Sequence, residues 1–222
     1  MLSWSSGKDS AWALHVLRRQ ALDVVGLLTT FNAAFDRVAM HAVRSELVTA
    51  QAAATGLPLW SVPLPWPCSN SDYERLMSGV LQQAVAARIT HVAFGDLFLE
   101  DIRDYRVRQL APTGIEPLFP LWCSPRDTPP ALARAMLDGG LKAVVTCIDS
   151  KKLPETFAGR AYDSTLLADL PLDIDPCGER GEFHTFCFAG PMFREPIALR
   201  VGDIVSRDGF CFADVLRDSR QG

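Results

Sequence analysis

Residues 2–10 read LSWSSGKDS, from Leu2 to Ser10, and this stretch decides the fold. A short apolar start runs into small hydroxyl and glycine residues, and an amphipathic pattern follows at once. This order predicts a strand, a tight loop and the beginning of a helix. Small side chains let a phosphate approach the backbone, and the free N–H groups of the first helical turn point towards it. The stretch therefore predicts an anion-binding site.

The Gly7-Lys8 pair does not make this loop a Walker P-loop. A Walker loop needs another glycine five residues before the glycine of the pair, and Ser or Thr directly after the lysine. Leu2 and Asp9 occupy those two places. The loop instead resembles the PP-loop pattern Ser-Gly-Gly-x-Asp-Ser of the N-type ATP pyrophosphatases, with Ser6 in place of the first glycine. Serine keeps such a loop if its backbone angles are ordinary; the alternative is a serine-rich cap on a core helix.

The composition is that of a globular protein with a sizeable core. The 222 residues suit one large domain, or one domain with a smaller lobe, and 48% of them are hydrophobic. The net charge of -4 and the pI of about 5.6 argue against a general nucleic-acid binder, which is usually basic. No apolar run reaches the ~20 residues that span a membrane, and the N-terminus has no secretory pattern, so we expect a cytoplasmic protein. The six cysteines include no C-x-x-C pair, which argues against zinc-ribbon, iron–sulfur and thioredoxin-like sites.

Helical and strand patterns alternate through the first half of the chain. The strand, helix, strand order predicts right-handed crossovers and a parallel sheet. Ligands bind such sheets beyond the carboxyl ends of the strands, so we expect the site at that edge. Residues 63–67 carry three prolines and are expected to form an extended connector. Helices are expected at about 9–19, 39–55, 71–88 and 96–108, and further strands at 24–29, 57–62 and 90–95.

The fourth strand ends in Gly95-Asp96, a polar break at the expected ligand edge. The charged segment DLFLEDIRDYRVR that follows at 96–108 has two interpretations. It is an ordinary solvated helix with i,i+4 ion pairs, or it brings Asp96, Arg103 and Arg106 to phosphates or to a substrate carboxylate. The residues alone leave both interpretations open.

The second half of the chain changes in pattern. The proline-broken stretch EPLFPLW at 116–122 indicates a transition out of the first domain. Residues 175–186, DPCGERGEFHTF, then combine two glycines, three acids, an arginine and a histidine, and a strand is expected after Glu182. Alternation from Ile197, with a turn signal at Asp208-Gly209, predicts a small antiparallel element. Other elements are expected at 128–138 (helix), 142–148 (strand) and 164–168 (short helix).

Four of these segments, taken in order, resemble one known family. They are residues 5–10, Gly95-Asp96 with the charged segment after it, 116–122 and 178–185. Together they are similar to the diphthine–ammonia ligase family of ATP-binding PP-loop proteins, and more closely to its bacterial branch. The resemblance implies a Rossmann-like α/β fold of the adenine nucleotide α-hydrolase type, with a five-stranded parallel sheet and a smaller α+β C-terminal lobe. It places the ATP-binding domain at 1–120 and a family-specific substrate lobe at 121–222.

The resemblance also implies a reaction. ATP would be cleaved between its α and β phosphates with the help of Mg²⁺, releasing pyrophosphate and transferring AMP to a carboxylate or carbonyl of an acceptor. Ammonia would then displace AMP and form an amide. The family's named acceptor, diphthine, would be absent from a bacterium, so the reaction type carries over better than the acceptor. The partners expected are ATP, ammonia and an unidentified acceptor, without a membrane.

Each candidate residue is assigned a role on this basis. The residues expected to bind the phosphates are Ser5, Ser6, Gly7, Lys8, Asp9 and Ser10, of which Lys8 is not obligatory. The adenine falls to Thr29, Thr30, Phe31 and Met40, with Phe31 equally well read as core, and Gly95 and Asp96 complete the cofactor site. The metal falls to Asp9 and Asp96, and the substrate's negative group to Arg103, Arg106 and Arg180. Catalysis falls to Asp9, Ser10, Glu179, Glu182 and His184, although His184 also reads as a hydrogen-bonded partner of Glu182.

Two other functions stay open. A PP-loop enzyme that modifies tRNA or a nucleoside is one alternative, and the acidic pI and the lack of a C-x-x-C pair argue against it. A non-catalytic ATP-binding protein of the universal-stress type is the other, but that type carries its phosphate loop late in the chain. A homo-oligomer is also possible, with apolar stretches at Pro65-Trp66 and Leu121-Trp122 as candidate interfaces.

Overall fold

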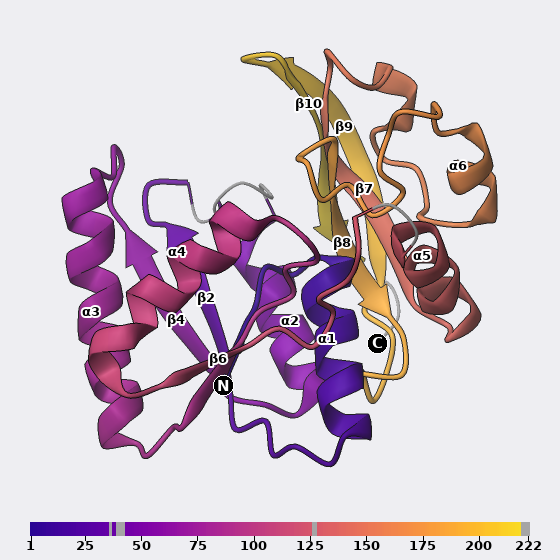
Figure 1. Ribbon diagram of the computed structural model, residues 1–222. Helices are drawn as coiled ribbons and strands as arrows, with labels where there is room; N and C mark the ends of the chain where they lie inside the picture. Colours follow the sequence, from indigo (N-terminus) through magenta and orange to yellow (C-terminus); the bar gives the residue numbers. More distant parts are fainter. Residues whose placement is uncertain (36, 39–42, 126–127, 219–222) are drawn as a thin grey trace.

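The computed structural model describes residues 1–35, 37–38, 43–125 and 128–218, which form two adjoining lobes (Figure 1). Each lobe is built around one sheet. The first sheet is mostly parallel, as the alternating helix and strand patterns predict, and the second is antiparallel. The fold class is therefore α/β and Rossmann-like in the first lobe, with a smaller α+β lobe after it, as expected.

The first sheet contains the five parallel strands that were expected. Their spatial order is β4-β2-β1-β5-β6, so the chain begins in the middle of the sheet and extends it in both directions. A two-residue strand, β3, pairs antiparallel with the end of β2. The bounds are β1 Leu2–Ser3, β2 Leu27–Asn32, β3 Arg37–Val38, β4 Leu59–Leu64, β5 His91–Ala93 and β6 Glu116–Leu118.

Helices cover both faces of this sheet. Leu27 and Leu28 are neighbours in β2 that belong to different apolar clusters, as a strand buried on both faces requires. The cluster of Leu27 includes residues of α1 and α2, and the cluster of Leu28 includes residues of α3 and α4. The bounds are α1 Lys8–Arg19, α2 Ser45–Thr55, α3 Asn70–Ala86 and α4 Glu100–Leu110, followed by the 3₁₀ turn η1 Ala111–Thr113.

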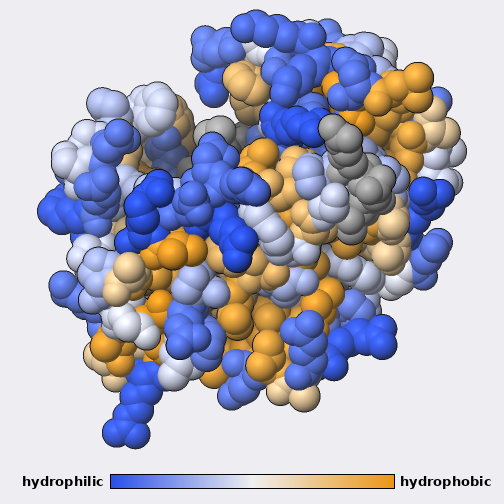
Figure 2. Space-filling model, in the orientation of Figure 1, coloured by the Kyte–Doolittle hydropathy of each residue, from blue (hydrophilic) through white to orange (hydrophobic). Residues whose placement is uncertain are grey.

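The second sheet has four antiparallel strands in the order β8-β7-β10-β9. The cluster that contains Trp4 and Leu14 of the first lobe continues into Met136 and Phe186 of the second, so the lobes share one core. In Figure 2, apolar residues gather in the lower middle of this face, and hydrophilic residues follow its upper edge. The bounds are α5 Thr128–Asp138, β7 Lys142–Asp149, η2 Glu155–Phe157, α6 Ser164–Asp169, β8 Phe183–Ala189, β9 Leu199–Arg207 and β10 Phe210–Arg217.

Four expectations about the elements were wrong in detail. The helix expected at 39–55 begins at Ser45, and the one expected at 96–108 begins at Glu100, because residues 96–99 form a loop that leaves the sheet edge. Residues 116–118 are not only a transition, because they form the last parallel strand. Pro63 belongs to β4 and not to a connector. The edge position of β4 accommodates a residue that has no N–H to donate.

None of the helices in the described ranges combines the length and the apolar character needed to cross a membrane.

Gln51 of α2 ties the first loop to both lobes from inside the core. The side chain is fully buried, and its Oε1 accepts a hydrogen bond from the indole N–H of Trp4 at 2.8 Å. Its Nε2 donates to the carbonyl oxygens of Ser6 at 2.9 Å and of Cys187 at 2.6 Å. Cys187 lies in β8, and its own N–H donates to the carbonyl of Ser6 at 3.0 Å. One amide group therefore satisfies polar groups just after β1, on the loop and on β8.

We expect Gln51→Ala to lower the free energy of unfolding by about 3 kcal/mol, because it leaves three buried polar groups without this partner. Urea denaturation followed by circular dichroism measures the change. Thr49→Ala is the matched control, because the Thr49 hydroxyl is on the same helix but exposed, where it donates to the carbonyl of Ser45. Equal stability of the two variants would contradict the role given to Gln51.

Candidate functional site

The loop after β1 forms a compact turn held by hydroxyl groups. Gly7 is the N-cap of α1, with an extended backbone, and the helix begins at Lys8. The hydroxyl of Ser5 donates to Oγ of Ser10 at 3.2 Å. The hydroxyl of Ser10 in turn donates to the carbonyl of Gly7 at 3.1 Å. The helix N-terminus carries a partial positive charge and has N–H groups without helical partners. Residues 5–10 thus form the tight turn before a helix that the sequence predicts, and anion binding by it stays a prediction.

Ser6 occupies a position that favours glycine. Its φ is 69°, in the left-handed region, where a side chain costs roughly 1–2 kcal/mol. Its hydroxyl is buried and has no hydrogen-bond partner among the described residues. Serine was expected to be harmless here only if its backbone angles were ordinary. They are not, because φ is positive. The loop nevertheless keeps its shape, because Gln51 and Cys187 both donate to the Ser6 carbonyl.

The ammonium group of Lys8 lies inside the protein, with only 2% of the residue exposed. Nζ donates to the two carboxylate oxygens of Asp9, at 2.9 and 2.8 Å, and to the carbonyl oxygen of Cys177 in the second lobe. The rings of Tyr162 and Phe183 each lie 5.6 Å from Nζ. Burial lowers the pKa of this ammonium, but Asp9, with further contributions from Cys177 and Glu179, outweighs burial and raises the pKa above its usual value. All three donors of Lys8 are thus used by protein groups.

A tight turn at residues 175–179 brings Glu179 to the first lobe. The carboxylate of Asp175 accepts the N–H groups of Cys177 and Glu179, both at 3.0 Å, and Gly178 has a φ of 67°. Oε1 of Glu179 accepts the N–H of Leu97 at 2.8 Å. Burial raises the pKa of the Glu179 carboxyl from 4.5 to about 8, against the lowering effect of the Leu97 hydrogen bond. This carboxyl therefore exchanges its proton near neutral pH.

Gly95 lets the end of β5 touch the start of α1. A Cβ atom at Gly95 would lie 2.9 Å from the backbone nitrogen of Ser10 and 3.0 Å from the carbonyl carbon of Asp9. The next residue, Asp96, has its Oδ2 3.5 Å from Nε of Arg106. Burial raises the pKa of Asp96, and the Arg106 guanidinium partly offsets this effect. The absence of a side chain at Gly95 thus sets the distance between the loop and Asp96.

These segments surround one cleft of about 250 Å³ at the junction of the lobes. The lining combines the loop after β1, the end of β5, Arg106 of α4, the 177–181 turn and the start of β8. The volume lies below the ~300–1,000 Å³ of most small-molecule pockets, so it suits part of a ligand rather than a whole nucleotide. The lining residues are Ser3, Ser5, Lys8, Asp9, Ser10, Phe94, Gly95, Asp96, Arg106, Cys177, Gly178, Glu179, Gly181, Phe183, His184 and Thr185.

Two of the candidate catalytic residues differ in their surroundings. His184 lines the cleft, and burial, together with the nearby Lys8 ammonium, lowers the pKa of its imidazole to about 4. The ring is therefore neutral at physiological pH. Glu182 lies outside the lining and is only 2% exposed. Its Oε2 has no hydrogen-bond partner among the residues that the structure describes.

Several other candidate residues lie away from the cleft lining. Arg103 stacks on Phe119 and Trp122, with its guanidinium carbon 5.5 and 4.8 Å from the ring centres. Arg180 lies 5.4 Å from the ring centre of Phe98. The other four are adenine candidates. Thr29 is buried with its hydroxyl donating to the Trp4 carbonyl, Thr30 is half-buried in β2, Phe31 is in the core, and Met40 lies outside the described residues.

Four residues of this site were not selected from the sequence. Thr185 accepts the backbone N–H of Lys8 at 3.1 Å, and Cys177 supplies the carbonyl for its ammonium. Asp175 shapes the turn, and Gln51 anchors the loop. Asp175 and Thr185 lie in the polar motif that the sequence singled out, so that motif was a usable signal. Gln51 is the one glutamine in an otherwise ordinary helix pattern and gave no signal.

The residues present fit a metal ion that is shared with a phosphate ligand. Asp9 and Asp96 both line the cleft, and Oδ2 of Asp96 is buried without a hydrogen-bond partner among the described residues. Within the same residues, no group of three or more acidic, histidine or cysteine side chains could hold a metal alone. Mg²⁺ commonly takes one or two carboxylates and completes its shell with phosphate oxygens and water. Such coordination suits this pair of carboxylates.

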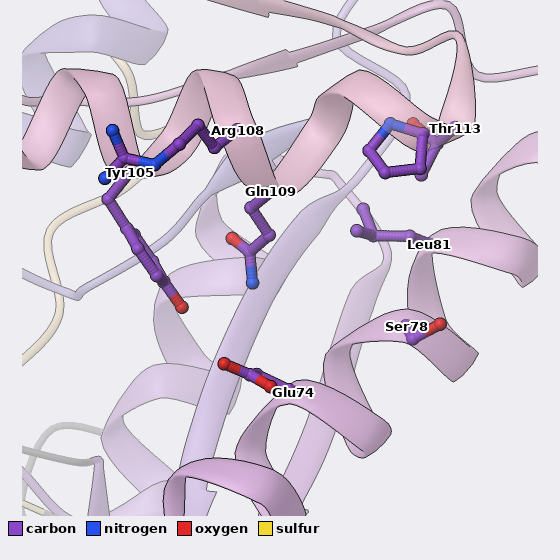
Figure 3. A pocket seen from close by; sticks show the side chains of 8 residues that line it. Glu74, Ser78, Leu81, Tyr105, Arg108, Gln109 and Thr113 are labelled. Carbon is purple, nitrogen blue, oxygen red and sulfur yellow. The ribbon is translucent and has the colours of Figure 1, made fainter.

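A second hollow, of about 420 Å³, lies between α3 and α4 (Figure 3). Its lining includes Glu74 and Ser78 of α3, and Tyr105, Arg108 and Gln109 of α4. It contains none of the loop residues and none of the 175–185 segment. It therefore serves as a comparison surface for experiments on the cleft.

Comparison with known proteins gives one family for both halves of the chain. A family model described as the diphthamide synthase N-terminal domain matches residues 1–110. A second, described as the diphthamide synthase C-terminal domain, matches residues 128–217. Only the segment between them and the last few residues are unmatched. A comparison with curated proteins found no match.

We expect Ser6→Gly to raise the free energy of unfolding by about 1 kcal/mol, because glycine adopts the positive φ without strain. Urea denaturation at constant pH measures the change. Ser6→Ala is the control, because it removes the unpartnered hydroxyl but keeps the strained backbone. A gain as large in Ser6→Ala as in Ser6→Gly would show that the hydroxyl, and not the backbone, is the cause.

We expect the stability of the wild type, relative to Glu179→Gln, to fall as the pH rises from about 4.5 to 8. In this interval the folded protein holds the Glu179 proton and the unfolded chain has lost it, so folding takes up a proton. Glutamine keeps the carbonyl that accepts the Leu97 N–H but does not titrate. Urea midpoints of both proteins at pH 5, 6, 7, 8 and 9 test this. A difference that stays constant with pH would place the Glu179 pKa near its ordinary value.

Proposed function

Because the chain belongs to the diphthamide synthase family of ATP-using enzymes, we propose that it is an AMP-forming amide ligase. It would transfer AMP from ATP to a carboxylate or carbonyl oxygen of a small acceptor, and ammonia would then replace AMP. One observation carries the proposal: the cleft places an anion-binding loop opposite an acidic turn from the other lobe. The loop suits a pyrophosphate leaving group, and the turn suits the chemistry of the acceptor.

The loop and the first turn of α1 would hold the phosphates. Backbone N–H groups of the first turn, apart from that of Lys8, which donates to Thr185, and the positive end of the helix dipole would stabilise negative charge, and this charge grows as pyrophosphate leaves. Mg²⁺, held through Asp9 and Asp96, would supply further neutralisation of the phosphate oxygens. The adenine would lie beyond the cleft, over the end of β2 near Thr29, Thr30 and Phe31. This division agrees with a cleft that is small for a whole nucleotide.

The first step would form a bond between an acceptor oxygen and the α-phosphorus, and break the bond from that phosphorus to pyrophosphate. In the second step, the nitrogen of ammonia would attack the activated carbon, AMP would depart, and the nitrogen would lose a proton. Glu179 is the best-placed base, because its carboxyl lies in the cleft with a pKa of about 8, near the operating pH. His184, neutral at that pH, could accept a hydrogen bond from the acceptor.

Arg106 is the substrate arginine that the geometry supports best. Its guanidinium lines the cleft, lies 3.5 Å from Asp96 and sits 4.9 Å from the ring centre of Phe94. Stacking fixes its plane, which suits recognition of a carboxylate or phosphate. Arg103 and Arg180 would then act from the rim. In domain terms, residues 1–120 would bind ATP and residues 121–222 would receive the acceptor.

We expect Ser10→Ala to reduce the ATP-dependent formation of AMP and pyrophosphate by about 10²-fold, the usual effect of losing one transition-state donor. The assay contains ATP, Mg²⁺, ammonium chloride and pooled small carboxylic acids, and chromatography separates AMP from ADP. Formation of AMP and pyrophosphate reports cleavage at the α-phosphate, whereas ADP and phosphate report cleavage at the γ-phosphate.

Ser78→Ala is the matched control, because Ser78 is an exposed serine that lines only the hollow between α3 and α4 (Figure 3). If Ser78→Ala lost activity while Ser10→Ala kept it in full, the nucleotide would bind in the hollow between α3 and α4 and not in the cleft. ADP as the product would exclude AMP-forming chemistry. Turnover that requires added tRNA would favour a tRNA-modifying enzyme instead.

A further inference from the structure

Strand β9 forms the outer edge of the second sheet and leaves one side without a partner. Its other side pairs with β10 along most of its length. Among the described residues, no further strand pairs with β9, so it presents a row of unpaired N–H and C=O groups. In Figure 1 the β9–β10 hairpin rises to the top of the second lobe. The strand nearest the cleft, β8, is at the opposite edge of the sheet, so a partner on β9 would leave the cleft open.

The exposed edge carries apolar side chains that favour strands. Val205 is 57% exposed, Ile204 43% and Val201 39%. Natural edge strands are usually short or blunted by bulges and charges, because a long apolar edge pairs with other chains. The one irregularity in the β9–β10 pairing lies between Val201 and Ile204 and leaves residues 204–207 in regular register, with Asp203 at its margin. This regular part is the segment available for pairing.

The charges on this segment are complementary to a second copy of the same strand. Asp203 and Arg207 lie two residues on either side of Val205, so the three side chains share one face. Asp203 makes no ion pair within the described residues, and Arg207 has an exposed ion pair with Asp208 at 3.5 Å and lies 5.7 Å from the ring centre of Phe212. When two copies run antiparallel with Val205 on the two-fold axis, Asp203 of each copy faces Arg207 of the other.

The neighbouring registers do not match. An axis at Ile204 places Asp203 opposite Val205, and an axis at Asp203 places the two carboxylates against each other. Among residues of β9 itself, only the register about Val205 joins two opposite-charge pairs with an apolar pair at the centre, because the register about Ile204 sets Arg200 opposite Asp208, which lies in the turn beyond the strand. Cross-strand pairs of both kinds stabilise antiparallel strands, and like charges directly opposite destabilise them.

We propose that β9 pairs antiparallel with β9 of a second copy about Val205, so that a homodimer joins the two four-stranded sheets into one. The contact is isologous, because the same strand serves both copies. It is independent of the proposed function, since it involves the edge remote from β8.

Sedimentation equilibrium of the full chain tests the proposal. We expect a mass of twice 24.4 kDa at micromolar concentration. Asp203→Arg should raise the dissociation constant by on the order of tenfold, because two attractive pairs become repulsive. The exchange Asp203→Arg with Arg207→Asp should restore much of the affinity. A mass of 24.4 kDa throughout, or a dimer indifferent to Asp203→Arg, overturns the proposal.

Cross-linking gives a second measurement. In Val205→Cys the two introduced thiols face each other at a Cα separation of about 4.5–5.5 Å, within the range of a disulfide. Oxidation should produce a covalent dimer on non-reducing electrophoresis, beyond any wild-type background. Arg200→Cys is the control, because in this register the two copies of residue 200 are about 33 Å apart. Cross-linking that is equal in both variants, or stronger in Arg200→Cys, overturns the register.

Discussion

The ammonium group of Lys8 is buried, so its charge needs ion-pair and hydrogen-bond partners at fixed positions. The site depends on this constraint. An unpaired buried cation costs several kcal/mol, so Asp9 and the Cys177 carbonyl have to be in place when the protein is folded. The Cys177 carbonyl is positioned by a turn whose N–H groups bind Asp175, and the same turn directs Glu179 to Leu97. One charge therefore couples the first loop, the acidic turn and the end of β5.

This coupling places the candidate chemistry between the lobes and not within either of them. The first lobe supplies a tight turn at a helix N-terminus, of a kind that binds anions on many nucleotide-binding sheets. The second lobe adds the groups that could act on an acceptor, and it also completes the loop, because Thr185 and Cys187 of β8 bind the backbone at Lys8 and Ser6. The two family models that match the chain describe these two parts as paired domains of one enzyme family. The cleft gives a physical reason for the pairing.

Local patterns were sufficient to predict the parallel sheet, the loop and the hairpin at the end of the chain, because each depends on residues close together in sequence. Local patterns could not predict that β8 packs against the loop, because Lys8 and Thr185 are 177 residues apart and no periodicity links them. The same reason explains Arg103. Its charge predicts a ligand contact, and nothing in the sequence indicated that the rings of Phe119 and Trp122, which follow β6, lie against its guanidinium. At Ser6 the sequence showed that the effect of serine depends on its φ, but it did not determine that angle. In the structure φ is positive.

The bond between Lys8 and Thr185 also has a consequence for the order in which the protein is made. A ribosome delivers the loop after β1 well before the groups that hold it, at residues 177, 185 and 187. Until then the Lys8 side chain lacks its burial site, and the loop backbone lacks two of its anchors. Chains that end before residue 187 would therefore lack a fixed loop, and the loop would acquire its final shape only after β8 has been made.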